Sequence, residues 1–100
     1  MAEDYNYPLN PDWTTEELIS VVDMWSKLEE AYEKKVQAED FLTTYADFKK
    51  VVKSIGEERQ LGREFEEVSG YSLYHVVKQA KAQKTGLLNR KDFEKWLKMN

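Results

Sequence analysis

Large apolar residues recur every three or four positions along most of the chain. They comprise Leu18, Val21, Val22, Trp25, Leu28 and Tyr32, followed by Phe41, Leu42, Tyr45, Phe48, Val52 and Ile55. This spacing places them on one buried helical face, because an α-helix has about 3.6 residues per turn. There is no strand-period run of useful length. The pattern predicts an all-α fold, a small helical bundle of four main helices plus a short C-terminal helix.

Capping residues predict where the first two helices begin and end. Thr14 and Glu17 have the spacing of a capping box, so the first helix begins there and extends to about Lys34. A second helix begins near Glu39, where acidic residues favour the positive end of the helix dipole, and extends to about Lys53.

The second half of the chain contains further capping residues. Ser54 predicts the start of a third helix that turns Leu61, Phe65 and Val68 inward and ends at Gly70. Gly62, inside this helix, costs about 1 kcal/mol relative to alanine, and we expect close helix packing there as compensation.

Two shorter helices complete the predicted bundle. Ser72 caps a fourth helix that ends before Gly86 and has a basic outer face. Asn89 can cap a last helix with Phe93 and Trp96 in its apolar stripe. Because a helix this short is unstable alone, it must dock on the bundle or on another copy of the chain.

The amino-terminal residues 1–13 are predicted to form an extended arm. Pro8 and Pro11 lack backbone donors and bias the preceding residues away from helical angles. The arm also carries too many apolar groups for a free tail. We expect it to lie in a groove between helices with Trp13 near the start of the first helix; alternatively, its tyrosines serve an external partner.

Length and composition indicate one domain, residues 1–100, and exclude several kinds of site. The chain of 100 residues is 41% hydrophobic and contains no cysteine, which excludes disulfides, zinc ribbons and thiol nucleophiles. A reducing cytoplasm fits this composition best. No signal peptide or membrane-spanning run is recognisable, so we expect a soluble, cytoplasmic protein without membrane partners.

Charge is unevenly distributed along the chain. Residues 1–47 contain 12 acids and 3 bases, a net charge of −9, whereas residues 48–100 contain 7 acids and 12 bases, a net charge of +5. The two parts can attract each other, or the late bases can simply solvate outer helix faces. Alternatively, a candidate basic patch binds an acidic partner. Its residues are Lys78, Lys81, Lys84, Arg90, Lys91, Lys95 and Lys98.

Residues with catalytic or metal-binding chemistry are sparse. His75 is the only histidine, and Ser72, three positions earlier, is better explained as a helix cap than as a nucleophile. We expect His75 to be a partly exposed helix residue. A single histidine cannot supply a bundle-type di-metal centre, and no glycine-rich phosphate loop is present. We therefore predict no catalytic residues, no cofactor and no metal, and a protein that is not an enzyme.

Ordered segments of the chain resemble a known family. These are YPLNPDW at 7–13 with the following TTEE, AYEK at 31–34, and EFEEVSGYSLYHVVK at 64–78. Over residues 5–82 the chain is similar to the YktA-like family of small uncharacterised proteins of Gram-positive bacteria. The resemblance implies an all-α fold in a cytoplasmic bacterial protein and carries over no activity or site residue. Residues 86–100 look like a C-terminal extension, and His75 stands where a basic residue is expected.

Three functional hypotheses remain. The first is a non-catalytic interaction module that binds a protein partner or forms a homo-oligomer. Its candidate contacts are Tyr5, Tyr7, Tyr71, Tyr74, Phe93 and Trp96. The second is binding of a polyanion or nucleic acid through the basic C-terminal third, which a pI near 5.1 disfavours. The third is a small-ligand binder or an enzyme of unknown type.

Overall fold

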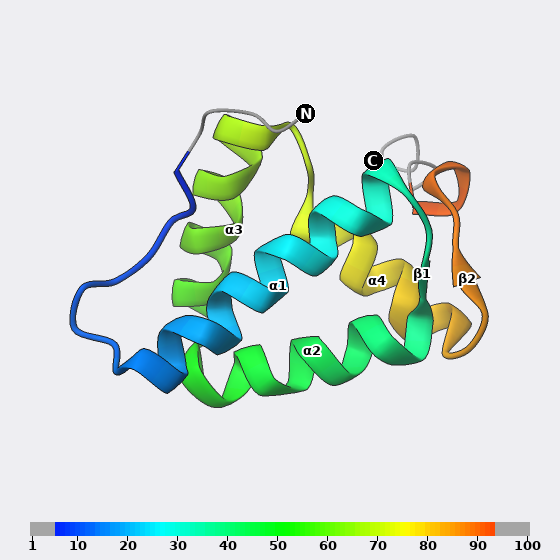
Figure 1. Cartoon of the computed structure of the whole chain (residues 1–100). Helices are drawn as coiled ribbons and strands as arrows, with labels where there is room; N and C mark the ends of the chain where they lie inside the picture. The colour runs from blue at the N-terminus through cyan, green and yellow to red at the C-terminus, as the bar shows by residue number, and fades with distance from the viewer. Residues whose placement is uncertain (1–5, 94–100) are drawn as a thin grey trace.

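The computed structural model describes residues 6–93 and confirms an all-α fold (Figure 1). Its complete helices are α1 (Thr15–Glu33), α2 (Ala38–Val51), α3 (Ile55–Ser69) and α4 (Leu73–Gln83). Helical backbone begins again at Arg90 and continues to the end of the described residues. A small antiparallel pairing joins β1 (Val36–Gln37) to β2 (Leu87–Leu88).

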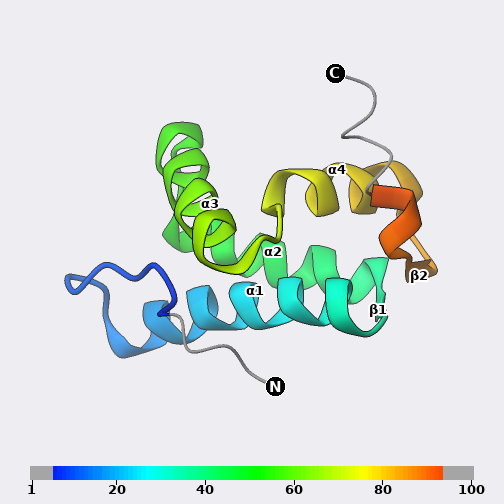
Figure 2. The same cartoon turned by 90° about the horizontal axis from the view of Figure 1, so that it is seen from above.

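The helices form two layers. α1 packs along α2, and α4 packs against both of them. Figure 2 shows α3 and α4 on the same side of the α1–α2 pair, with α3 at the end where α1 begins. Only Phe65 is buried in α3, so this helix lies at the margin of the bundle.

The centre of the core is aromatic. The Trp25 ring stacks on Phe65 at a centroid distance of 4.7 Å and meets the edge of Phe48 at 5.6 Å. All three side chains are fully buried. Because they come from α1, α3 and α2, this one cluster holds three helices together, and offset or edge contacts of this kind add to the free energy of burial.

Hydrogen bonds confirm the predicted starts of α1, α3 and α4. The Thr14 hydroxyl accepts from the backbone N–H of Glu17 at 3.1 Å, and the Glu17 carboxylate accepts from the backbone N–H of Thr14 at 2.9 Å. Ser54 and Ser72 likewise cap α3 and α4. Gly70 ends α3 with a φ of 81°, the left-handed conformation that glycine adopts without steric cost.

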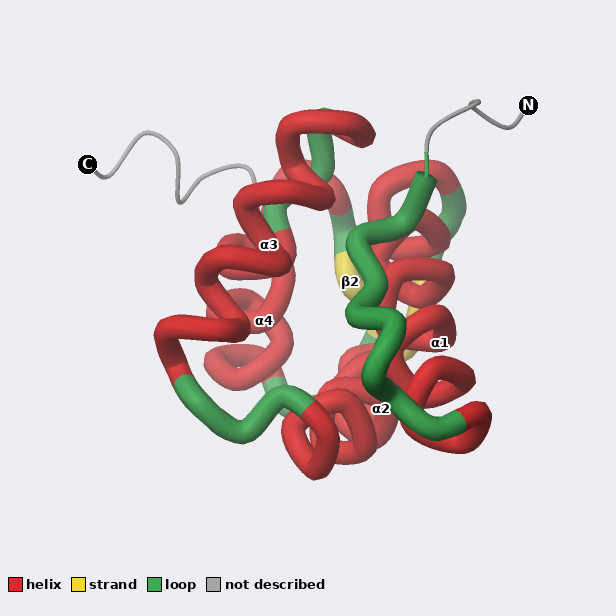
Figure 3. Tube along the Cα trace, turned by 90° about the vertical axis from the view of Figure 1, so that its left-hand side faces the viewer, coloured by secondary structure: helices red, strands yellow, loops and turns green. Residues whose placement is uncertain are grey.

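The described part of the amino-terminal arm, residues 6–13, packs between two helices, as predicted; these are α1 and α3. The Tyr7 hydroxyl donates to Glu29 of α1 at 2.8 Å, and its ring meets the edge of Phe65 of α3 at 5.9 Å. The indole N–H of Trp25 donates to the Pro8 carbonyl at 3.2 Å. Figure 3 shows this segment beside α1 on the side that faces α3. These contacts therefore add to the Trp25–Phe65 stack in joining α1 to α3.

Three predicted burials are wrong. Ile55 and Val68 are 58% and 47% exposed, although both were expected on buried faces. Ile55 does not continue the apolar face of α2, because the chain turns after Val52 and Ile55 begins a new helix. Val68 lies in the last turn of the marginal helix α3. His75, expected to be partly exposed, is buried at 9% exposure because its side of α4 faces the bundle.

Candidate functional site

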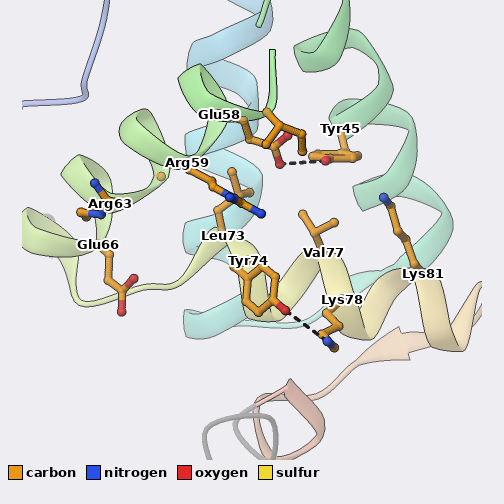
Figure 4. Close-up of a pocket in the computed structure, with 12 residues that line it drawn as sticks. Tyr45, Glu58, Arg59, Arg63, Glu66, Leu73, Tyr74, Val77, Lys78 and Lys81 are labelled. Atoms are coloured by element: carbon orange, nitrogen blue, oxygen red, sulfur yellow. Dashed lines mark hydrogen bonds between the residues drawn. The ribbon is translucent and has the colours of Figure 1, made fainter. Parts of the chain in front are cut away.

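An open groove of about 470 Å³ lies between α3 and α4 (Figure 4). Its volume is within the usual range for ligand sites. The lining residues are Tyr45 from α2; Ile55, Glu58, Arg59, Gly62, Arg63 and Glu66 from α3; and Leu73, Tyr74, Val77, Lys78 and Lys81 from α4. Their spacings of three, four and seven residues place each set on one side of its helix.

The floor of the groove is apolar. Leu73 and Val77 stand one turn apart on α4 and are only 3% and 7% exposed. On the opposite side, Gly62 presents bare backbone, and a β-carbon there would lie 3.7 Å from the Leu73 side chain. This is an ordinary van der Waals distance, so the expected close packing at Gly62 is real but leaves room for a methyl group.

The rim of the groove carries more positive than negative charge. Arg59 and Arg63 stand one turn apart on α3, and Lys78 and Lys81 stand on α4. Within residues 6–93, no ion pair is recorded for either arginine. The lining also includes two carboxylates, on Glu58 and Glu66. Counting the described residues of the lining, four cations face two carboxylates, which gives this part of the groove an excess of positive charge.

One of these carboxylates is already neutralised at the α2 end of the groove. Glu58 accepts from the Tyr45 hydroxyl at 2.7 Å and from the Lys49 ammonium at 2.7 Å. Burial, followed by the hydrogen bond to the negatively charged Glu58, raises the pKa of Tyr45 well above its usual value of 10. The Lys81 ammonium lies 5.3 Å from the centre of the Tyr45 ring, within cation–π range. These contacts anchor this wall of the groove.

Two large apolar side chains are exposed at the groove. Tyr74 is 63% exposed and accepts a hydrogen bond from Lys78 at 3.1 Å, and Ile55 is 58% exposed. They stand on opposite walls, one on α4 and one on α3. An exposed aromatic ring beside basic side chains is typical of the anchors found in protein interfaces.

The candidate contact residues fall in different environments. Among the candidates within residues 6–93, Tyr74 is the one that lines the groove. Tyr7 and Tyr71 are half-buried and donate to Glu29 and Glu33 of α1, so they hold the structure together. Phe93, proposed from the sequence as a partner contact, is fully buried with its ring edge against Tyr32. It therefore offers no surface to a partner. Tyr5 and Trp96 lie outside the described residues.

The candidate basic patch is also divided. Lys78 and Lys81 line the groove. Arg90 lies over the Tyr32 ring at 5.3 Å and is not part of the lining. Lys84 and Lys91 are exposed elsewhere, and Lys95 and Lys98 lie outside the described residues. The groove instead adds the two arginines of α3, which the sequence analysis did not single out. In the sequence, these arginines share one side of α3 with Ile55 and Glu66, a pattern typical of an ordinary solvated face. Only the packing of α4 beside α3 turns this side into a groove wall.

Ser72 and His75 are joined through the helix cap. The Ser72 hydroxyl accepts from the backbone N–H of His75 at 3.2 Å, which confirms its role as a cap, while the His75 ring meets the edge of Tyr74 at 5.5 Å. Across residues 6–93, no cluster of three or more potential metal ligands is found.

None of the helices in the described part of the chain combines the length and the apolar character needed to cross a bilayer.

Comparisons with known proteins identify relatives over most of the chain. The Uncharacterised protein family (UPF0223) matches residues 4–89. The chain is 57% identical over 90 residues to a UPF0223 protein of Enterococcus faecalis, covering 90% of this chain and 98% of that protein. It is 53% identical over 89 residues to one of Streptococcus sanguinis, covering 89% and 97%. It is 52% identical over 82 residues to the UPF0223 protein YfdD of Lactococcus lactis, covering 82% and 88%.

Proposed function

The chain belongs to the UPF0223 family, and from its own geometry we propose that it is a non-catalytic protein–protein interaction module that binds its partner in the α3–α4 groove. The observation that carries this proposal is the combination of an apolar floor, a basic rim and the exposed Tyr74 ring in one groove. Such a combination supplies both the apolar contact and the charged rim that protein interfaces use.

The groove lining favours binding over catalysis. Among residues 6–93, the lining contains no histidine, cysteine, serine or aspartate. Its two phenols and two carboxylates include one hydrogen-bonded pair, Tyr45 with Glu58. The Tyr45 phenol is held neutral by burial and by its bond to Glu58, which makes it a poor base or nucleophile at neutral pH. These features support an interaction role.

The setting of this activity is also part of the proposal. We infer that the protein acts in the cytoplasm, because a cysteine-free chain has no dependence on an oxidising compartment. We also infer that the YktA-like proteins, whose motifs the chain resembles, belong with the UPF0223 relatives.

Site-specific photo-crosslinking tests the interaction role. A benzophenone amino acid replaces Tyr74 in the groove and, as a matched control, the exposed Leu87 of β2 outside the groove lining, each in protein expressed in a Gram-positive host. We expect a discrete crosslinked protein from position 74 that position 87 does not yield. The crosslinked protein, once identified by mass spectrometry, is purified and its affinity for the wild-type chain is measured by calorimetry.

Two variants connect the crosslink to the groove. Arg59→Gln with Arg63→Gln should weaken the measured affinity, whereas Lys35→Gln with Lys91→Gln removes the same charge from exposed positions outside the groove and should not. The proposal fails if position 74 yields no specific crosslink, or if both double variants bind equally well.

A further inference from the structure

We propose that the groove binds an acidic amphipathic α-helix of a partner protein, an inference that rests on the interaction role proposed above. The helix would place one or two apolar side chains on the floor and carboxylates against the basic rim. The charge, the shape and the exposed apolar groups of the groove each restrict the occupant.

Charge is the first restriction. Arg59 and Arg63 line the groove from α3, and the opposite wall supplies Lys78 and Lys81. Figure 4 shows the Arg59 side chain reaching toward α4. Glu58 is bound to Lys49 and Tyr45 and so does not neutralise this rim. Guanidinium groups pair with carboxylates in a two-pronged geometry, so an occupant with acidic side chains on both flanks matches both walls.

Shape is the second restriction. The lining of α4 runs from Leu73 to Lys81, which spans about 12 Å, or roughly two turns of a helix. Both walls are helices whose backbone groups are already bonded internally, so they offer an extended peptide no row of hydrogen-bonding partners. A helical occupant satisfies its own backbone and needs only side-chain contacts, as in other helix-in-groove complexes.

Apolar contact is the third restriction. The floor residues Leu73 and Val77 are flanked by the exposed side chains of Tyr74 and Ile55. Phosphates of a nucleic acid would gain nothing from this floor, whereas leucine or phenylalanine side chains at helical spacing would cover it. An amphipathic helix is therefore favoured over a polyanion that is charged on all sides.

A second copy of the chain is an alternative occupant, because α1 carries an exposed acidic stripe. Glu16, Asp23 and Glu30 recur at seven-residue spacing with the exposed Ile19 between them. This stripe faces solvent, while the opposite face of α1 is buried in the core against α2. Because the stripe is acidic and exposed, self-association is measured alongside binding of the partner helix.

A synthetic peptide provides the test. The probe is a capped peptide of roughly 18 residues with leucines every three or four positions and glutamates on the flanks. One control has the same composition with the leucines scattered around the helix, and another replaces the glutamates by lysines. We expect the acidic amphipathic probe to bind with a dissociation constant on the order of 10 µM, as suits a small interface, and neither control to bind comparably.

Charge-neutral variants and salt locate the binding. Arg59→Gln with Arg63→Gln should raise the dissociation constant about tenfold, while Lys35→Gln with Lys91→Gln should leave it unchanged. Raising the salt from about 50 mM to about 500 mM should weaken binding as well. Backbone amide shifts in labelled protein should concentrate in residues 55–66 and 73–81. Circular dichroism of each free variant confirms that its helices remain.

Several outcomes overturn the proposal. Equal binding of the lysine probe, binding that the arginine substitutions do not weaken, or amide shifts elsewhere would each do so. Tighter binding of a single-stranded DNA oligomer than of the acidic probe would assign the groove to a polyanion. Sedimentation showing dimers that Asp23→Asn with Glu30→Gln dissociates would assign it to a second copy. A Tyr74 crosslink to a non-acidic segment would overturn this inference while leaving the interaction role intact.

Discussion

The Tyr45 hydroxyl donates to Oε2 of Glu58 across 2.7 Å, and this bond joins α2 to α3 at the end of the groove. The other carboxylate oxygen of Glu58 accepts from Lys49 at the same distance. Because the Glu58 side chain is only 14% exposed, its charge depends on these two partners for the hydration it has lost. The cluster thus stabilises the bundle and also positions one wall of the groove.

Substitution of Tyr45 by phenylalanine tests this cluster. Tyr45→Phe keeps the ring but removes one of the two donors to a partly buried carboxylate, so the free energy of unfolding should fall by about 1 kcal/mol. Urea denaturation at neutral pH measures the change. Tyr74→Phe is the control, since it removes a phenol whose bond to Lys78 is exposed and should change stability by less than about 0.5 kcal/mol. Equal losses in the two variants would contradict the assignment.

Stability should decline at high pH because the half-buried Tyr7 phenol keeps its proton more tightly in the folded chain than in the unfolded chain. Burial, then the hydrogen bond to Glu29 and the charges of Glu29 and Glu33, raise the pKa of Tyr7 from 10.0 to about 12. The unfolded chain therefore loses this proton from pH 10 upward, while the folded chain keeps it until about pH 12. Stability from this group is fully present below pH 10 and is lost between pH 10 and 12.

Tyr7→Phe removes this titration. Compared with the wild type, the variant should lose less stability between pH 9 and pH 12, as measured by urea midpoints along a pH series. Parallel curves for wild type and Tyr7→Phe would show that Tyr7 titrates alike in the folded and unfolded chains.

The arm should contribute to the attachment of α3. Tyr7→Ala removes both the ring that packs on Phe65 and the hydrogen bond to Glu29, and should cost about 2 kcal/mol. Tyr7→Phe at neutral pH should cost less than half of that, because the ring contact remains. Hydrogen exchange then measures the local effect: amides of α3 should lose more protection in Tyr7→Ala than amides of α2.

Substitution by alanine should change the stability in opposite directions at Gly56, in the first turn of α3, and at Gly70, its C-cap. Gly70→Ala forces a β-carbon into the left-handed conformation at a φ of 81° and should lower stability by about 1 kcal/mol. Gly56 lies in the first turn of α3 with no atom near an added β-carbon, so Gly56→Ala should raise stability by about 0.5 kcal/mol. Thermal unfolding of both variants measures the contrast.

Local patterns in the sequence determined most of the secondary structure. Ser54 and Ser72 set helix starts, and Gly70 sets a helix end, because a cap depends on the hydrogen bonds and backbone angles of a few neighbouring residues. Helical periodicity likewise placed Trp25 and Phe48 in the core.

Tertiary structure alone decided the burial of marginal residues and the identity of the groove. Val68 fits the helical period but remains exposed because α3 reaches the edge of the bundle. The two-residue strands β1 and β2 pair across about fifty residues and carry no periodic pattern. Arg59 and Lys78 belong to separate helices and line one site only because α3 packs beside α4. Caps and periodicity are local properties of the chain, whereas a binding surface depends on which helices become neighbours when the core forms.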